Sequence, residues 1–159
     1  MSTVPITPRG LKLLHARLKQ LREVDRPQNV RDIEEALAHG DLRENAEYHA
    51  AKDRQAQIDG MMKWAEGQIA SAEVIDPTKL DGFRVMFGAT VTLSDAEDDD
   101  SKPTRYQLVG ESESDLAQGR ISFASPIARA LMGKEEGDEV TIVTPSGRRK
   151  IVIDEVEFI

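Results

Sequence analysis

The sequence of 159 residues contains no cysteine and few aromatic residues, and both absences exclude classes of protein. Without cysteine there is no disulfide framework, no thiolate nucleophile and no cysteine-ligated zinc or iron–sulfur site. The three histidines, His15, His39 and His49, are far apart and form no HExxH metal-binding pattern. Because only 4% of the residues are aromatic and 31% are charged, we expect a thin buried surface rather than one thick core.

The chain also lacks long apolar runs. No stretch approaches the roughly 18–20 apolar residues of a membrane-spanning helix, and the start MSTVPITPRG has neither the basic residues nor the apolar segment of a signal peptide. We therefore expect a soluble cytoplasmic protein with no membrane partner. The net charge of −8 argues against direct binding to free RNA or DNA, because such binding depends on basic side chains that neutralise phosphates.

The hydrophobic pattern changes near residue 76 and divides the chain into two predicted domains. Residues 1–76 show helical spacing, whereas residues 77–159 show alternating strands separated by glycine and proline. The first part carries 11 basic and 13 acidic residues, and the second carries 10 and 16, so most of the excess acid lies in the second part. The expected fold class is α+β, with a helical domain over 1–76 and a small α+β domain over 77–159.

Two apolar stripes in the first part predict two packed helices. Thr7-Pro8 is typical of a helix start, with an N-cap followed by proline at the first helical position. One stripe breaks at Pro27, which predicts a kinked helix or two stacked helices. Its apolar positions are Leu11, Leu14, Leu18, Leu21, Val30, Ile33 and Leu37. The positions of the other stripe are Tyr48, Ala51, Gln55, Ile58, Met62, Ala65, Ile69 and Ala72. Together they predict an antiparallel coiled-coil hairpin with arms of about 40–45 Å.

The residues that link the two helices, GDLRENAEY at 40–48, form an acidic tip at the point where the hairpin reverses. Asp41 and Glu44 are spaced to point toward the same end of the hairpin if the second helix begins just after Asp41. In one interpretation they form a capping box and have only a structural role. In the other they contribute to a Mg²⁺ site, but two carboxylates are too few for a dedicated cage. The tip would then complete a site that belongs to a partner, and the free protein would hold no metal ion.

The second part predicts a small domain of several strands and one short helix. Ser125-Pro126 is typical of a helix start, and Gly133 of a helix end, which predicts a helix over 127–132. The acidic run at 95–100 lacks the pattern of a calcium loop, and we expect a solvated hairpin loop there. The strands are predicted at 84–93, 104–109, 119–123, 139–144 and 148–158.

GDLRENAEYHAAK at residues 40–52 and SPIARALMGKEEGDEV at residues 125–140 resemble the GreA/GreB family of bacterial transcript-cleavage factors, and the similarity covers essentially the whole chain. The resemblance implies an N-terminal antiparallel coiled coil and a C-terminal FKBP-like domain that docks on RNA polymerase at its secondary channel. It also implies that the coiled coil enters this channel and stimulates the polymerase's own cleavage of the 3′ end of backtracked nascent RNA, which rescues arrested elongation complexes.

The same resemblance implies roles for individual residues. Asp41 and Glu44 would assist the polymerase active centre by helping to hold a Mg²⁺ ion shared with the polymerase, so the chain would not be an enzyme by itself. The basic residues expected near the RNA are Arg43, Lys52 and Arg54, although solvated side chains or helical ion pairs explain them equally well. The candidate polymerase-docking residues are Ser125, Pro126, Ile127 and Ala128, which also fit plain helix-start roles.

Two other functions stay open at this point. A homologue that binds the same channel without promoting cleavage would inhibit the polymerase. An FKBP-type prolyl isomerase is the second alternative, and the shortage of aromatic residues argues against it because the active pocket of that family is rich in them. Fold alone does not decide between such functions.

Overall fold

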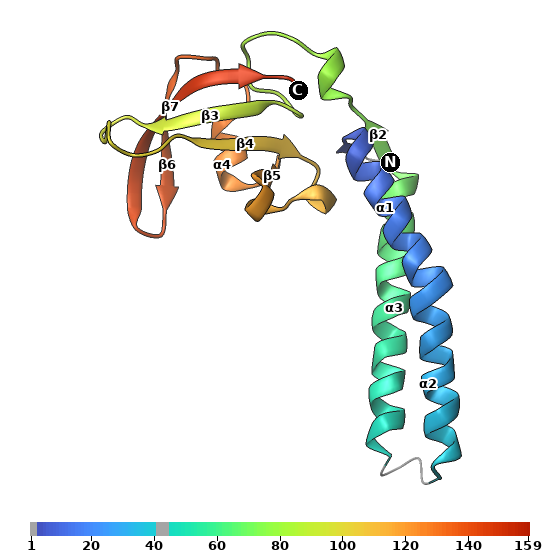
Figure 1. Cartoon of the computed structure of the whole chain (residues 1–159). Coiled ribbons are helices and arrows are strands. Elements are labelled where there is room, and N and C mark those ends of the chain that lie inside the picture. Colours follow the sequence, from blue (N-terminus) through green and yellow to red (C-terminus); the bar gives the residue numbers. More distant parts are fainter. Residues whose placement is uncertain (1–2, 41–44) are drawn as a thin grey trace. The chain divides into compact units, whose positions relative to one another are not determined.

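The computed structural model describes residues 3–40 and 45–159 (Figure 1). The described chain forms two compact units, one over Leu11–Ser71 and one that joins residues 3–10 to Ala72–Ile159. Residues 3–10 and 72–76 therefore belong to the second unit, although the sequence grouped them with the helices. None of the helices in the described ranges is long and apolar enough to cross a membrane.

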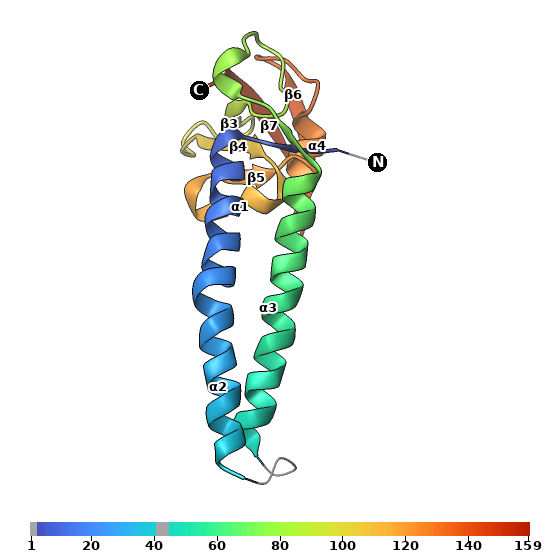
Figure 2. The same cartoon turned by 90° about the vertical axis from the view of Figure 1, so that its right-hand side faces the viewer.

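The first unit contains two helical arms. The first arm consists of α1 (Pro8–Gln20), which begins in the second unit, a π-helical turn at Leu21–Asp25, and α2 (Arg26–Ala38). The second arm is α3 (Ala46–Ala70). Figures 1 and 2 show α2 and α3 side by side and running in opposite directions.

The π-helical turn explains how the first arm passes Pro27. Proline has no N–H to donate, and its ring crowds the carbonyl of the preceding turn. The N–H of Arg26 bonds to the carbonyl of Leu21, five residues back, so the turn just before Pro27 is wider than an α-helical turn. The predicted interruption near Pro27 therefore takes the form of a π-helical turn within a continuous arm.

The extra residue of this turn changes which side chains face α3. The buried positions of α2 are Asn29 and Ala36, one residue later than an uninterrupted heptad would place them after Leu21. Val30 and Leu37 are 43% and 45% exposed, so their assignment to the packed stripe is wrong. The stripe of α3 is confirmed at its buried positions, Ala51, Ile58, Met62 and Ala65.

The second unit is built on a five-stranded sheet with the order β5-β4-β3-β7-β6. Neighbouring strands of this sheet are antiparallel, except β4 and β5, which are parallel. The short helix α4 (Pro126–Leu131) buries Ala128 and Leu131 in the core. The strands are β3 (Thr90–Asp95), β4 (Thr104–Val109), β5 (Arg120–Ser122), β6 (Glu139–Thr144) and β7 (Gly147–Glu157).

Most of the predicted elements of this unit are confirmed, but the first strand is shorter than expected. β3 begins at Thr90 rather than at residue 84, because Gly88 adopts a φ of +88° and turns the chain. A second, two-stranded parallel sheet was not foreseen. It pairs β1 (Val4–Ile6) with β2 (Ala72–Val74) and brings the start of the chain beside residue 72.

Candidate functional site

The structure describes the chain before and after the acidic tip, up to Gly40 and from Asn45 on. Asp41, Arg43 and Glu44 lie outside the described residues. On the first side, α2 ends at Ala38 and Gly40 takes a φ of +108°, which only glycine adopts readily. Nothing lies within 4 Å of the position of a Cβ atom at Gly40, so backbone conformation rather than crowding calls for glycine. The turn away from α2 is thus encoded at Gly40.

On the second side, Asn45 fixes the start of α3. Its Oδ1 accepts a 3.1 Å hydrogen bond from the N–H of Tyr48, which makes Asn45 the N-cap of α3. Its Nδ2 donates a 2.6 Å hydrogen bond to the carbonyl of Ala36 in α2. One side chain therefore caps one arm and ties it to the other.

This geometry tests the interpretation of the acid pair as a capping box of the second helix. Because Asn45 is the N-cap and Ala46 is the first residue of α3, the interpretation that gave Asp41 that role is wrong. The carboxylates of Asp41 and Glu44 are not needed to cap α3, and their role in a metal site stays a prediction. No group of three or more metal-ligating side chains occurs within residues 3–40 and 45–159.

The third acidic residue of the tip, Glu47, has a partner across the turn. Glu47, in the first turn of α3, lies 3.9 Å from the Nε2 of His39, and both side chains are largely exposed. An exposed pair of this kind contributes about 0–1 kcal/mol. Glu47 is therefore a solvated carboxylate and a matched control for the acid pair.

The predicted basic residues of α3 are exposed. Lys52 donates a 2.7 Å hydrogen bond to Gln55, one turn further along the same helix. Neither Lys52 nor Arg54 forms an ion pair with another residue that the structure describes. The helical ion pairs considered as an alternative are thus not seen, and both charges face solvent.

The four candidate docking residues do not have equal access to a partner. Ser125 is the N-cap of α4, and its Oγ accepts a 3.3 Å hydrogen bond from the N–H of Ala128. Pro126 is exposed and Ile127 is half-buried, whereas Ala128 is fully buried. A docking surface here can therefore use Pro126 and Ile127 directly, while Ala128 can only support them from within.

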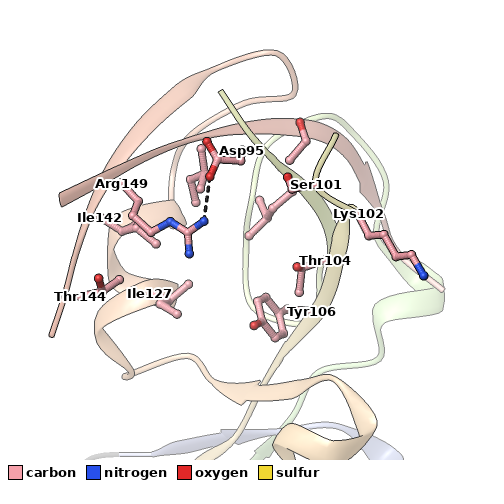
Figure 3. A pocket seen from close by; sticks show the side chains of 12 residues that line it. Asp95, Ser101, Lys102, Thr104, Tyr106, Ile127, Ile142, Thr144 and Arg149 are labelled. Atoms are coloured by element: carbon pink, nitrogen blue, oxygen red, sulfur yellow. Dashed lines mark hydrogen bonds and ion pairs between the residues drawn. The ribbon is translucent and has the colours of Figure 1, made fainter. Parts of the chain in front are cut away.

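Ile127 also lines a pocket of about 260 Å³ between α4 and the sheet (Figure 3). Ile127, Tyr106 and Ile142 point into it, and the side chains of Asp95 and Arg149 lie together at one end. The full lining is Leu93, Ser94, Asp95, Ser101, Lys102, Thr104, Tyr106, Ile127, Ile142, Thr144, Arg149 and Ile151. Tyr106 is the one aromatic residue in this lining, which does not match the aromatic pocket expected of a prolyl isomerase.

Asp95 is held as a carboxylate at the edge of this pocket. Its pKa lies below the usual range, first because the N–H of Glu97 donates to it and then because Arg149 donates a 2.8 Å hydrogen bond to its Oδ2. Hydrogen bonds to the charged form favour that form. The acidic loop that follows is a surface loop, as expected.

Comparison with known proteins assigns the family. Residues 4–74 match the family model described as "Transcription elongation factor, N-terminal". Residues 81–158 match the model described as "Transcription elongation factor, GreA/GreB, C-term". The chain belongs to the GreA/GreB family of transcription elongation factors. These matches favour an elongation factor over a prolyl isomerase.

Individual relatives of this GreA/GreB-family chain cover its full length. A protein named transcription elongation factor GreA, from Anaeromyxobacter sp. (strain K), is 54% identical over 100% of this chain and 95% of its own length. A protein of the same name from Xylella fastidiosa (strain 9a5c) is 49% identical over 98% of both chains. The crystal structure of Thermus aquaticus Gfh1 is 25% identical, covers 99% of both chains and has a TM-score of 0.45.

Sequence reasoning missed two polar residues that shape the helical unit of this elongation factor. Asn45 could have been found, because asparagine before an alanine-rich helix is a strong N-cap signal. Asn29 gave no such signal, since a polar residue beside Val30 looks like a solvent-facing position. Its burial follows from the phase shift at the π-helical turn, which the sequence pattern does not specify.

Proposed function

We propose that this chain stimulates RNA polymerase to cleave the 3′ end of backtracked RNA, with its helical unit reaching into the secondary channel. In this proposal the two arms form an antiparallel coiled coil and the second unit is an FKBP-like docking domain. Membership of the GreA/GreB family supports the proposal. Such a factor works in the cytoplasm, where the polymerase is, and the nuclease centre belongs to the polymerase rather than to this chain.

The length of the helical unit suits this role. The 25 residues of α3 correspond to about 38 Å at about 1.5 Å per residue. In the sequence, Asp41 and Glu44 follow the end of α2 and precede the start of α3, and the proposal assigns them to the far end of the two arms. A long, narrow support of this kind can carry a few side chains into an active centre that a globular domain cannot enter.

Asp41 and Glu44 are the residues that would hold a Mg²⁺ ion together with the polymerase. Two carboxylates suit Mg²⁺, which usually keeps several waters and takes further oxygens from phosphate. The ion would supply a water of lowered pKa and would stabilise charge on the reacting phosphate. Because Asn45 rather than Asp41 caps α3, the lone pairs of the Asp41 carboxylate are not taken up by that cap.

Other residues of the chain would bind rather than react. Lys52 and Arg54 face solvent on α3 without an ion pair to any described residue, which leaves their charges available to a phosphate backbone. Pro126 and the half-buried Ile127 would contact the polymerase, and Ser125 would hold their helix in shape. Arg43 is expected to act with Lys52 and Arg54.

The observation that carries the proposal is that Asn45 caps α3, so the acid pair that precedes it in the sequence is not needed for that cap. The direct test adds the full chain to a stalled, backtracked elongation complex with labelled RNA. The proposal predicts RNA shortened from its 3′ end and renewed elongation. If the polymerase slows while the RNA keeps its length, the chain is a channel inhibitor and the proposal is wrong.

A further inference from the structure

The second unit contains a buried carboxylate that the proposed mechanism does not use. Glu113 is 5% exposed and lies at the end of a 3₁₀ turn, Glu111–Glu113. Its oxygens accept hydrogen bonds from the N–H of Thr7 at 3.0 Å, from the N–H of Gly110 at 3.0 Å, and from the hydroxyl of Thr7. Among the described residues it has no cationic partner.

This single carboxylate caps two helical turns. At its own 3₁₀ turn it accepts the N–H of Gly110, as the third residue of a capping box does. At the start of α1, the hydroxyl of Thr7 accepts a 3.1 Å hydrogen bond from the N–H of Gly10, and Glu113 accepts the N–H of Thr7. In an ordinary capping box, the N–H of Thr7 would be accepted by a side chain at position 10, but this position is glycine. Here the acceptor lies 106 residues further along the chain.

Glycine at positions 10 and 110 makes this arrangement possible. A Cβ atom at Gly10 would overlap the carboxyl group of Glu113, and one at Gly110 would lie 2.6 Å from the carbonyl oxygen of Pro5. Neither glycine has a positive φ, so both serve close approach rather than a left-handed backbone. The start of α1 is therefore fitted closely against the 3₁₀ turn of the second unit.

We propose that Glu113 is a positioning residue for cleavage stimulation, and this rests on the function proposed above. The chain passes between the two units twice, after Gly10 and after Ser71. The second passage leads directly into β2, which is paired with β1. Glu113 fixes the first passage by attaching the first turn of α1 to the second unit. A docked second unit can then hold the helical arms in a restricted range of directions, as a catalytic group requires.

The absence of cysteine allows a direct measurement on the full chain. Spin labels at Asp59→Cys in α3 and Thr141→Cys in β6, both exposed positions, report the distribution of distances between the two units. We expect this distribution to broaden with Glu113→Ala and to stay as in the parent chain with Glu111→Ala, an exposed neighbouring carboxylate. An unchanged distribution with Glu113→Ala would overturn the proposal.

A combined variant separates attachment from local helix capping. Gly10→Glu with Glu113→Ala supplies a local acceptor to Thr7 and restores an ordinary capping box without the link to residue 113. The distribution should stay broad in this variant although α1 is capped. Recovery of the parent distribution would show that capping alone matters and would overturn the role of Glu113. Glu113→Gln keeps the side-chain shape and an acceptor for both amides, so it should give the same distribution as the parent chain.

The activity readout uses unlabelled chains and a backtracked elongation complex. Glu113→Ala should lower the maximal cleavage rate by about tenfold or more, while the concentration that gives half the maximal rate stays near that of the unsubstituted chain. A variant that merely unfolds would change both quantities and would lose helical circular dichroism. If the unsubstituted chain promotes no cleavage, the proposed function fails, while the distance measurement still decides whether Glu113 restricts the two units.

Discussion

The side-chain amide of Asn29 in α2 donates a 2.9 Å hydrogen bond to the main-chain carbonyl of Ala51 in α3. Asn29 is 3% exposed, so the two arms are joined by a buried polar bond as well as by apolar packing. This bond lies on the tip side of the π-helical turn, where the apolar pattern of α2 is weakest. It fixes which residue of α2 faces which residue of α3, because a buried amide without a partner is unfavourable.

Asn29→Ala should therefore destabilise the helical unit. Loss of the amide removes the bond to Ala51 and leaves a small gap, and we expect a cost of about 1–3 kcal/mol in the free energy of unfolding. Val30→Ala is the matched control, since Val30 is 43% exposed, and it should cost much less. Chemical unfolding followed by circular dichroism at 222 nm measures both. Equal costs for the two variants would contradict the importance of the Asn29 bond.

Asn45 offers a test that separates two bonds made by one side chain. Asn45→Asp keeps an acceptor for the N–H of Tyr48 but cannot donate to Ala36, whereas Asn45→Ala loses both bonds. We expect Asn45→Ala to cost about 1–2 kcal/mol and Asn45→Asp to cost less, by the same unfolding measurement. If Asn45→Asp is as damaging as Asn45→Ala, the tie to Ala36 rather than the cap of α3 carries the stability.

The pocket in the second unit gives a prediction about pH. The pKa of Asp95 is lowered in the folded chain, so its bonds add stability above the unfolded pKa of about 3.9, and this is lost as the pH falls through the lower folded value. Carboxyl carbon chemical shifts followed by NMR measure the pKa directly. Arg149→Gln should raise it only part of the way, because the N–H of Glu97 still donates. An unchanged pKa would mean that the bond between Arg149 and Asp95 is absent in solution.

Much of the fold followed from the sequence because local signals were strong. Strands at 104–109 and 139–144, the helix after Ser125 and the stripe of α3 all have clear periodicity or capping residues. The errors arose where the local hydrophobic pattern does not specify the outcome. The buried Asn29 depends on a π-helical turn, and β1 depends on pairing with β2, which follows it by about 65 residues.

The candidate site was predicted only in part. The acid pair Asp41 and Glu44 stays a prediction, because both lie outside the described residues, whereas Lys52, which the sequence also singled out, is exposed on α3. The attachment of Thr7 to Glu113 was not predicted, because the two residues are 106 positions apart and the usual capping position holds Gly10. Ala128 was predicted at a docking surface together with the residues before it, but it is fully buried in the core.

The proposal depends most on Asp41 and Glu44, which would complete the polymerase's cleavage centre. The measurement is the initial rate of 3′-end cleavage in a backtracked elongation complex at saturating factor, for the unsubstituted chain, Asp41→Asn/Glu44→Gln and the control Glu47→Gln. We predict that the double variant loses about 100-fold in rate, still competes with the unsubstituted chain for the polymerase, and that the control keeps its rate. Cleavage by the double variant at the unsubstituted rate would contradict the claim.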